Sequence, residues 1–399
     1  MYLVINFIVL FTGVLTLLMY LRYRYVMRES TKPVERKHWP KITILIPVYN
    51  EEDVIEDTLK SVFSIDYPKE KLEIIVINDG STDRTREILR RYEDRVRVID
   101  KPNGGKADAL NWGLREASGE FVAVLDSDTR VPPDVFKRIL PYFNDPSVAA
   151  VDVTILPMNR RNLLERMQYI EYHIIAVYRK LLEAINAIYV TPGFAVYRTD
   201  VLKKLGGWDT KNLTEDIEIA WRILFNGYKI RMARDVVAYT IVPRSFWKFW
   251  KQRVRWNIGG LQTYIKYLKQ GIRGKGPVSY YLIPFFSIGY MASMIGIFLF
   301  LYMGANVFVD TLLTWMYRIL AGVFPPVELQ VLVTYEWVLA ALTLVLSFTL
   351  LFIALRHARY HPRLIDLFIY AFLYVGVFLP LLAYSFIKYI KGELAWFTR

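Results

Sequence analysis

The sequence predicts an α/β domain, a mostly parallel sheet with helices on both faces, joined to transmembrane α-helices and amphipathic interfacial helices. Short apolar segments alternate with amphipathic ones between residues 41 and 125, which is the pattern of such a sheet. Polar loops follow three of the apolar segments, at the edge where ligands enter open α/β sheets. Long uncharged stretches near both ends of the chain predict the membrane segments.

The apolar runs and the amphipathic segments give the expected elements in chain order. Apolar runs predict strands at 41–47, 72–77, 96–99, 121–125 and 187–190. Helical spacing predicts helices at 51–63, 83–92 and 106–116. Thr82 or Asp83 is the expected cap of the second helix. The segment 161–189 is expected to form either an interfacial helix pair or a helix of the core.

Composition excludes several classes of protein. The chain has 399 residues, enough for two or three domains, and no cysteine, so neither a disulfide nor a thiolate metal site is possible. Its net charge of +13 suits nucleic acid, anionic lipid or a phosphorylated substrate. No Gly-x-Gly-x-x-Gly motif and no phosphate-binding Gly-Lys-Ser/Thr loop occurs, which argues against a dinucleotide-dependent dehydrogenase or an ATPase. The four histidines have no zinc-site pattern.

Residues 1–24 are expected to form a transmembrane helix. Residues 1–21 carry no charge, so no Lys or Arg stands before an apolar core as in a signal peptide, and no small-residue cleavage site follows. A membrane anchor is therefore favoured over a signal peptide. Basic residues gather between 22 and 37. The positive-inside rule then places this flank in the cytoplasm and the N-terminus outside. Residues 40–244 follow as a cytoplasmic domain.

The C-terminal region, 276–399, is expected to hold about three spans. Uncharged stretches lie at 276–309, 337–355 and 367–387. The intervening segment 308–324 carries Asp310 and Arg318, so we expect a re-entrant or interfacial helix there, although a further span would reverse the last two crossings. Residues 245–275 mix aromatic and basic side chains, as a helix on an anionic membrane surface does.

Two carboxylates, Asp126 and Asp128, follow the strand expected at 121–125. Oxygen ligands of this kind suit Mg²⁺ or Mn²⁺, which commonly hold a substrate diphosphate. The plainer alternative makes Asp128 the cap of a helix over 134–142. An Asp-x-Asp pair alone does not decide between them.

Six motifs in one order decide the matter. They are Pro47-Val48-Tyr49-Asn50-Glu51-Glu52, Asn78-Asp79-Gly80-Ser81-Thr82-Asp83, 103–111 with Gly104-Gly105-Lys106, Asp126-Ser127-Asp128, Thr214-Glu215-Asp216 and Gln252-Arg253-Val254-Arg255-Trp256. Together they resemble the family 2 glycosyltransferases with a GT-A fold, over about residues 40–270. More narrowly they resemble the membrane-embedded processive branch of cellulose, hyaluronan and poly-N-acetylglucosamine synthases. Thr214-Glu215-Asp216 and the segment 250–260 are most similar to the last group.

The resemblance implies a role for each matching residue. Asp216, with Glu215 beside it, is the catalytic base that takes a proton from the acceptor hydroxyl in an inverting transfer. Asp128, with Asp126, is the ligand of Mn²⁺ or Mg²⁺. The acceptor is expected at Trp256, Gly193 and Phe194. The nucleotide sugar is expected at Pro47, Tyr49, Glu51, Asp79, Lys106, Asp126, Gln252 and Arg255.

Each of these residues also has a structural explanation. Asp79 can stabilise its own turn, and Lys106 can be a solvated surface lysine. Glu215 and Asp216 can complement the dipole of a helix capped by Thr214. Gln252, Arg255 and Trp256 are spaced i, i+3, i+4, so they share one helix face in either case.

The resemblance implies a processive enzyme that polymerises a UDP-sugar, UDP-N-acetylglucosamine above others, and exports the polymer across the plasma membrane. A single-addition glycolipid synthase resembling glucosylceramide synthases is the alternative. The partners expected are the donor, a growing glycan or lipid acceptor, membrane lipid and an accessory export subunit. Nucleic acid is not expected because no recognition motif occurs. A transporter is disfavoured because the expected spans carry no charged residues and show no repeated halves, and a sensor because the motif carboxylates are intact.

Overall fold

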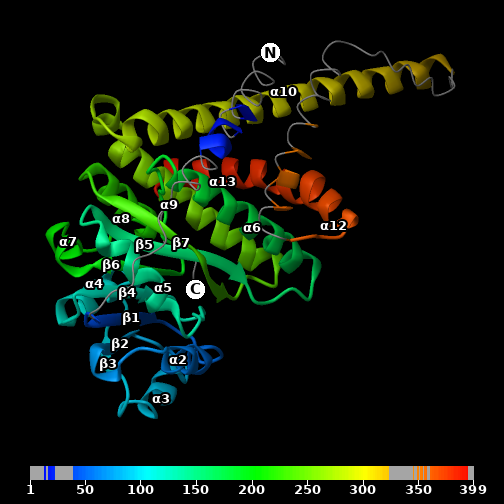
Figure 1. Ribbon diagram of the computed structural model, residues 1–399. Helices are drawn as coiled ribbons and strands as arrows, with labels where there is room; N and C mark the ends of the chain where they lie inside the picture. Colours follow the sequence, from blue (N-terminus) through cyan, green and yellow to red (C-terminus); the bar gives the residue numbers. More distant parts are fainter. Residues whose placement is uncertain are drawn as a thin grey trace.

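A computed structural model describes residues 13–14, 17–22, 39–322, 345, 348–349, 351–353, 355–356 and 360–393 (Figure 1). The spans predicted at 1–21 and 337–355 lie largely outside these residues, as does most of the basic flank at 22–37. The sidedness of the N-terminus therefore stays a prediction.

Across residues 39–322 the strands form one seven-stranded sheet in the order β3-β2-β1-β4-β6-β5-β7. Strands β1 to β4 run parallel, β6 is antiparallel to β4 and β5, and β7 is parallel to β5. The predicted mostly parallel sheet is confirmed. The strand bounds are β1 Ile42–Val48, β2 Leu72–Asp79, β3 Arg97–Lys101, β4 Phe121–Leu125, β5 Val148–Pro157, β6 Phe194–Arg198 and β7 Lys229–Thr240.

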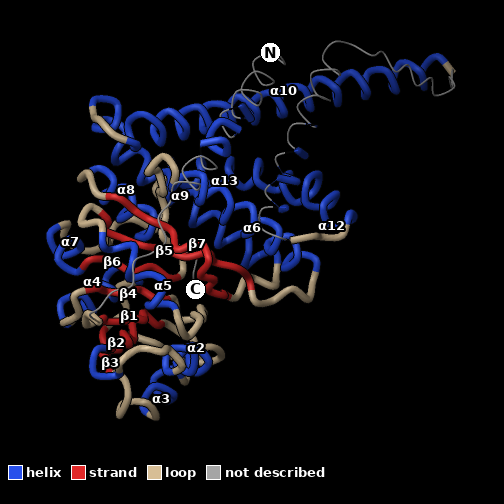
Figure 2. The backbone as a smooth tube through the Cα atoms, viewed as in Figure 1, coloured by secondary structure: helices blue, strands red, loops and turns tan. Residues whose placement is uncertain are grey.

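Helices cover both faces of the sheet (Figure 2). Successive side chains of a strand point to opposite faces, so each face packs its own apolar side chains against helices. Ile42, Ile44 and Ile46 of β1 pack in a core with α2, α3 and α5. Leu45 of β1 and Ile75 of β2 pack in a second core with α4 and α8. The helices of this domain are α2 Ile55–Phe63, α3 Thr85–Arg90, α4 Lys106–Glu116, α5 Val135–Ile139, α6 Leu163–Glu183, α7 Thr199–Lys204 and α8 Glu215–Phe225, with short turns η1 Lys69–Lys71 and η2 Leu140–Asn144.

The segment 161–189 holds one helix, α6, so the predicted helix pair is wrong, and α6 packs on the sheet as the core-helix alternative expects. A capping box between Asn162 and Glu165 begins α6, and its face toward the sheet packs on β5 and β7. Arg179 of α6 forms a buried ion pair with Asp152 of β5. A helix anchored by a buried charge pair belongs to the core of the domain.

The strand expected at 187–190 is also wrong. Ala187 and Ile188 are buried, but in irregular backbone between α6 and β6. Asn186 and Gly193 both have positive φ, at 54° and 67°, so the chain turns at each end of this segment. Strand β6 begins only at Phe194, where it pairs with Leu125 of β4. The apolar residues of this buried loop have the composition of a strand, which explains the wrong prediction.

Within the residues that the structure describes, two helical segments are long and apolar enough to cross a membrane, Val278–Phe298 and Leu364–Ile390. The first contains the π-helical turn η3 Val278–Leu282 and enters α10 Ile283–Ala321. The second comprises α12 Leu364–Ile369, the π-helical turn η4 Tyr370–Tyr374, η5 Val375–Val377 and α13 Phe378–Ile390.

Helix α10 continues to Ala321, so the separate helix expected at 308–324 is wrong (Figure 1). It has no proline after its first turn, and it ends at Gly322 in the left-handed conformation. At 1.5 Å per residue its 39 residues span about 58 Å, against a hydrocarbon core of about 30 Å. Asp310 and Arg318 lie in the second half of α10, beyond the candidate span Val278–Phe298, and both are exposed.

Helix α9, Phe246–Arg273, joins the sheet domain to the apolar helices. It packs against α8 on one side and against α13 and α10 on the other. The sequence predicts an interfacial helix over 245–275, and the structure has a helix there; its place at a membrane surface stays a prediction. The position of each α9 side chain at the site therefore depends on packing against both the sheet domain and the apolar helices.

Candidate active site

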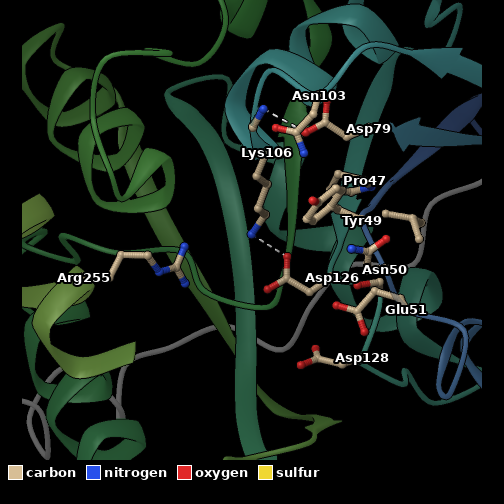
Figure 3. Close-up of a pocket in the computed structure, with 13 residues that line it drawn as sticks. Pro47, Tyr49, Asn50, Glu51, Asp79, Asn103, Lys106, Asp126, Asp128 and Arg255 are labelled. Atoms are coloured by element: carbon tan, nitrogen blue, oxygen red, sulfur yellow. Dashed lines mark hydrogen bonds and ion pairs between the residues drawn. The ribbon is translucent and has the colours of Figure 1, made fainter. Parts of the chain in front are cut away.

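A cleft of about 580 Å³ opens at the carboxyl ends of β1, β2 and β4 (Figure 3). Strand β1 has β2 on one side and β4 on the other, so its end is a switch point of the sheet, where such folds bind ligands. Predicted donor and metal residues that line the cleft are Pro47, Tyr49, Glu51, Asp79, Lys106, Asp126, Asp128 and Arg255. Asn50, Asn103 and Ser127 also line it.

Asp79, at the end of β2, holds the loop that leads into α4. Its two carboxylate oxygens accept the backbone N–H groups of Gly104 at 2.9 Å and Gly105 at 2.8 Å, and Lys101 pairs with it. Gly105 has φ +88°, a conformation that side chains disfavour. Asp79 therefore fixes the start of α4, and a carboxylate has lone pairs left for a ligand in the cleft.

Lys106 is the first residue of α4 and links two carboxylates. Its Nζ lies 2.6 Å from Oδ1 of Asp126 and 2.8 Å from Oε1 of Glu215 (Figure 3 shows the first pair). Burial lowers the pKa of Lys106, but Asp126, Glu215 and Asp216 outweigh burial and hold the pKa above its ordinary value. Lys106 is thus a permanent cation in the cleft rather than a solvated surface lysine.

Three carboxylates gather on the other side of the cleft. Burial and the charge of Asp126 raise the pKa of Asp128 to about 6. Burial and the charge of Asp128 raise the pKa of Glu51 to about 7. Asp128 accepts hydrogen bonds from Thr129 and Thr240, each at 3.1 Å. Helix α5 has Asp134 at its N-cap position, so Asp128 is not the cap of that helix.

This donor set fits a divalent cation that is completed by a ligand. Asp126, Asp128 and Glu51 all supply hard oxygens. Burial and neighbouring negative charge raise the pKa values of Asp128 and Glu51, and a cation would neutralise that charge. Among the described residues no group of three His, Asp or Glu side chains is placed to hold an ion unaided. An ion bound at Asp128 would therefore need further oxygens, which a diphosphate supplies.

Glu215 and Asp216 begin α8, with Thr214 at the N-cap position. The Thr214 hydroxyl bonds to Asn212 Oδ1 at 3.2 Å, so the predicted side-chain cap does not form. Burial and the charge of Glu215 raise the pKa of Asp216 to about 6. Burial raises the pKa of Glu215, but Lys106 outweighs it and the net shift is downward. The two neighbouring carboxylates thus differ: Glu215 holds Lys106, and Asp216 is poised to exchange a proton.

Gly193 contacts the site through its backbone, whereas Phe194 is a residue of the core. The carbonyl of Gly193 accepts the N–H of Asp126 at 2.9 Å, which fixes the start of the loop after β4. The Phe194 side chain is 1% exposed and packs beside Phe136 in the core. The acceptor role predicted for Phe194 therefore has no support in the position of its side chain.

Gln252, Arg255 and Trp256 lie together on α9, as their spacing predicts. Arg255 lines the cleft, while Gln252 and Trp256 lie outside its lining. Helices α8 and α9 touch at Gly259, where an added Cβ would come 2.6 Å from Cγ2 of Thr214. That close approach sets the distance between Asp216 on α8 and the motif on α9.

Sequence reasoning overlooked Arg253, inside the same motif. Its guanidinium carbon lies 4.0 Å from the centroid of the Trp256 ring, and its side chain is 3% exposed. The available signal was its spacing, because Phe249, Arg253 and Trp256 are i, i+4 and i+7 on one face. A charged residue in such a stripe indicates a buried partner, which here is Glu171.

Comparison with known proteins agrees with this geometry. The model of glycosyl transferase family 2 matches residues 43–206. Poly-beta-1,6-N-acetyl-D-glucosamine synthase of Staphylococcus epidermidis is 34% identical over 287 residues, covering 70% of this chain and 69% of the relative. The synthase of the same name from Staphylococcus aureus strain MSSA476 is 35% identical over 256 residues, covering 61% and 62%.

Among solved structures, the mannosyltransferase PcManGT from Pyrobaculum calidifontis, in complex with GDP-Man and Mn²⁺, has a TM-score of 0.63 at 23% identity. The match covers 98% of this chain and 99% of that chain. It confirms the GT-A fold, together with the arrangement of sheet and helices predicted from the sequence.

Proposed function

Because the chain belongs to glycosyl transferase family 2 and is a glycosyltransferase, we propose that it is an inverting, processive β-glycosyltransferase that builds a polymer of N-acetylglucosamine from UDP-N-acetylglucosamine. The observation that carries the proposal is the identity of 34% over 287 residues with a polymer synthase of that sugar. The site supports it, since Asp216, whose pKa is raised by burial and by Glu215, lies near the cations Lys106 and Arg255 that would hold a diphosphate.

The site residues divide the reaction between them. Lys106 and Arg255 line the cleft as cations for the diphosphate of the donor. The acceptor hydroxyl attacks the anomeric carbon, the bond from that carbon to the diphosphate oxygen breaks, and Asp216 takes the hydroxyl proton. Attack from the side opposite the leaving group inverts the anomeric configuration. Lys106 stays charged throughout, because its three carboxylate neighbours hold its proton.

We propose that Asp128, with Asp126, holds Mn²⁺ or Mg²⁺ together with the diphosphate. When bound, the ion would neutralise charge on the departing nucleotide, so no second protein acid is required. Asp79 and the loop it fixes would contact the nucleoside, with Pro47 and Tyr49 on the facing wall of the cleft. Trp256, beside the cleft on α9, would receive the acceptor sugar.

The placement in the membrane follows from the two candidate spans. We propose that residues 40–244 lie in the cytoplasm, because basic residues gather just before them, between 22 and 37, and basic flanks favour the cytoplasmic side of a membrane. The polymer would leave between the apolar helices. We also propose an accessory subunit that assists this export. Helix α9 would lie at the membrane surface, since Trp247 is 71% exposed near basic residues.

The experiment is a donor panel with the detergent-purified full chain and Mn²⁺. Radiolabelled UDP-N-acetylglucosamine, UDP-glucose and GDP-mannose are offered singly, and products are separated by size and by partition into solvent. The proposal expects a large water-soluble product from UDP-N-acetylglucosamine. A one-sugar product that partitions with lipid would instead identify a glycolipid synthase, and incorporation from GDP-mannose alone would refute the donor.

A further inference from the structure

Each of the two candidate spans contains a π-helical turn, and a tyrosine of each turn contacts α6. Tyr281 of η3 lies with its hydroxyl 2.9 Å from that of Tyr178. Tyr374 of η4 donates its hydroxyl to Oε2 of Glu171 at 2.7 Å. Glu171 and Tyr178 are seven residues apart, which is two turns of α6, so they share one face. Helix α6 therefore receives both spans along one line.

Only one of these two contacts continues to the motif on α9 in the part of the chain that the structure describes. Oε2 of Glu171 also accepts a hydrogen bond from Nη2 of Arg253 at 2.6 Å. The side chains of Arg253 and Glu171 are 3% and 11% exposed, so the ion pair is shielded from water. A continuous chain of contacts thus runs from Tyr374 through Glu171 and Arg253 to Trp256.

The end of this chain is a cation over an aromatic ring. The Arg253 guanidinium lies 4.0 Å from the centroid of Trp256 and 5.1 Å from that of Phe249. Such contacts are stronger when the cation is desolvated, and the planar guanidinium can stack on a ring while it donates to a carboxylate. Glu171 keeps the buried cation compensated, and it restricts the guanidinium to one plane.

We propose that Arg253 is a positioning residue that fixes the ring of Trp256, and that Tyr374 of the C-terminal candidate span sets the position of Arg253 through Glu171. The proposal rests on the proposed function for one step only, the binding of the acceptor sugar at Trp256. The span would then control how well the acceptor is held, while binding and cleavage of the donor would proceed without it.

The test compares two matched variants, Tyr374→Phe and Tyr178→Phe. Each removes one hydroxyl from a tyrosine at the contact between α6 and a candidate span, and each keeps the ring. Kinetics with UDP-N-acetylglucosamine and an N-acetylglucosamine oligomer give the KM of acceptor and donor, and donor hydrolysis by water is followed separately. We expect Tyr374→Phe to raise the acceptor KM about fivefold, from the loss of a hydrogen bond to a charged group. Donor KM and hydrolysis should not change.

An unchanged acceptor KM in Tyr374→Phe would overturn the proposal, as would equal losses of transfer and hydrolysis, which would indicate a general structural role. Tyr178→Phe should keep the acceptor KM of the wild type, and an equal rise in both variants would also contradict the proposal. Arg253→Lys keeps the charge but loses the planar fork, so an acceptor KM equal to that of the wild type would contradict it too.

A second measurement does not depend on turnover. In protein labelled with 5-fluorotryptophan, the resonance of Trp256 is identified by its loss in Trp256→Phe. It should shift in Tyr374→Phe and in Arg253→Lys but not in Tyr178→Phe. A resonance that stays in place in the first two variants refutes the positioning role. Absence of transfer from every donor, with the expected shifts present, would refute the proposed function and leave the positioning role supported.

Discussion

Lys106 and Glu215 are the first residues of two different helices, α4 and α8, and their side chains meet with Nζ 2.8 Å from Oε1. The same ammonium group lies 2.6 Å from Asp126. One cation therefore joins the start of α4, the loop after β4 and the start of α8. The side proposed to bind the nucleotide and the side proposed to transfer the proton share this residue.

Replacing Lys106 with Met should reduce turnover about a hundredfold, the usual cost of removing one group that stabilises developing charge. The substitution also leaves Asp126 and Glu215 without their cation. Since the charge of Lys106 lowers the pKa of Asp216, its loss should move the acid limb of the rate profile to higher pH. Steady-state kinetics between pH 5 and 9 would measure both effects. Lys211→Met, at an exposed lysine, is the control, and equal rates in the two variants would contradict the role.

The rate of transfer should depend on a group with a pKa of about 6. Burial and Glu215 raise the pKa of Asp216 to this value, and only its deprotonated form accepts the proton. At saturating donor and metal, the rate should be constant above about pH 7 and fall tenfold per unit below the pKa. In Asp216→Asn the nucleotide should still bind, as titration calorimetry with UDP can show, while transfer falls by several orders of magnitude. Normal turnover in that variant would exclude Asp216 as the base.

Gly259→Ala should harm both stability and activity, because the new methyl group would lie 2.6 Å from Cγ2 of Thr214. Overpacking of this kind costs about 1–3 kcal/mol, and here it would push α8 away from α9. Gly260→Ala is a matched control, since its Cβ would meet only the Tyr290 hydroxyl at 3.8 Å. Thermal unfolding and transfer rates would be compared for the two variants. Equal behaviour would show that the α8–α9 contact does not matter.

Removal of divalent metal should abolish transfer, and Mn²⁺ or Mg²⁺ should restore it. The carboxylates of Asp128 and Glu51 have raised pKa values, which a bound cation would lower. Asp128→Asn should therefore raise the metal concentration for half-maximal rate about tenfold or more, the loss of one charged ligand. Full activity in excess chelator would refute the metal site.

The parts predicted well from sequence are those whose signal is local. Helix α4 and strand β4 begin and end at the predicted residues, because Gly105 precedes α4, polar residues flank β4, and each has a consistent apolar pattern. The donor side of the cleft follows from the parallel strands, since their carboxyl ends meet at one edge. The proximity of those residues could therefore be predicted from the expected parallel strands alone.

The parts that sequence reasoning missed depend on partners distant in the chain. Glu171 bonds to Arg253, 82 residues away, and to Tyr374, 203 residues away, and no periodicity shows such pairs. The buried loop at 187–193 has the composition of a strand, but its backbone turns at Asn186 and Gly193. The length of α10 was underestimated because Asp310 and Arg318 were taken to end the apolar helix, although exposed charges are compatible with its continuation.

The most direct test of the central claim is the length of the product after a short reaction with excess fluorescent acceptor oligomer and UDP-N-acetylglucosamine. A processive enzyme keeps its product between additions, so we predict a few long β-linked chains while most acceptor remains unextended. Uniform growth of all acceptors by one sugar at a time would contradict the processive polymerisation proposed for this chain.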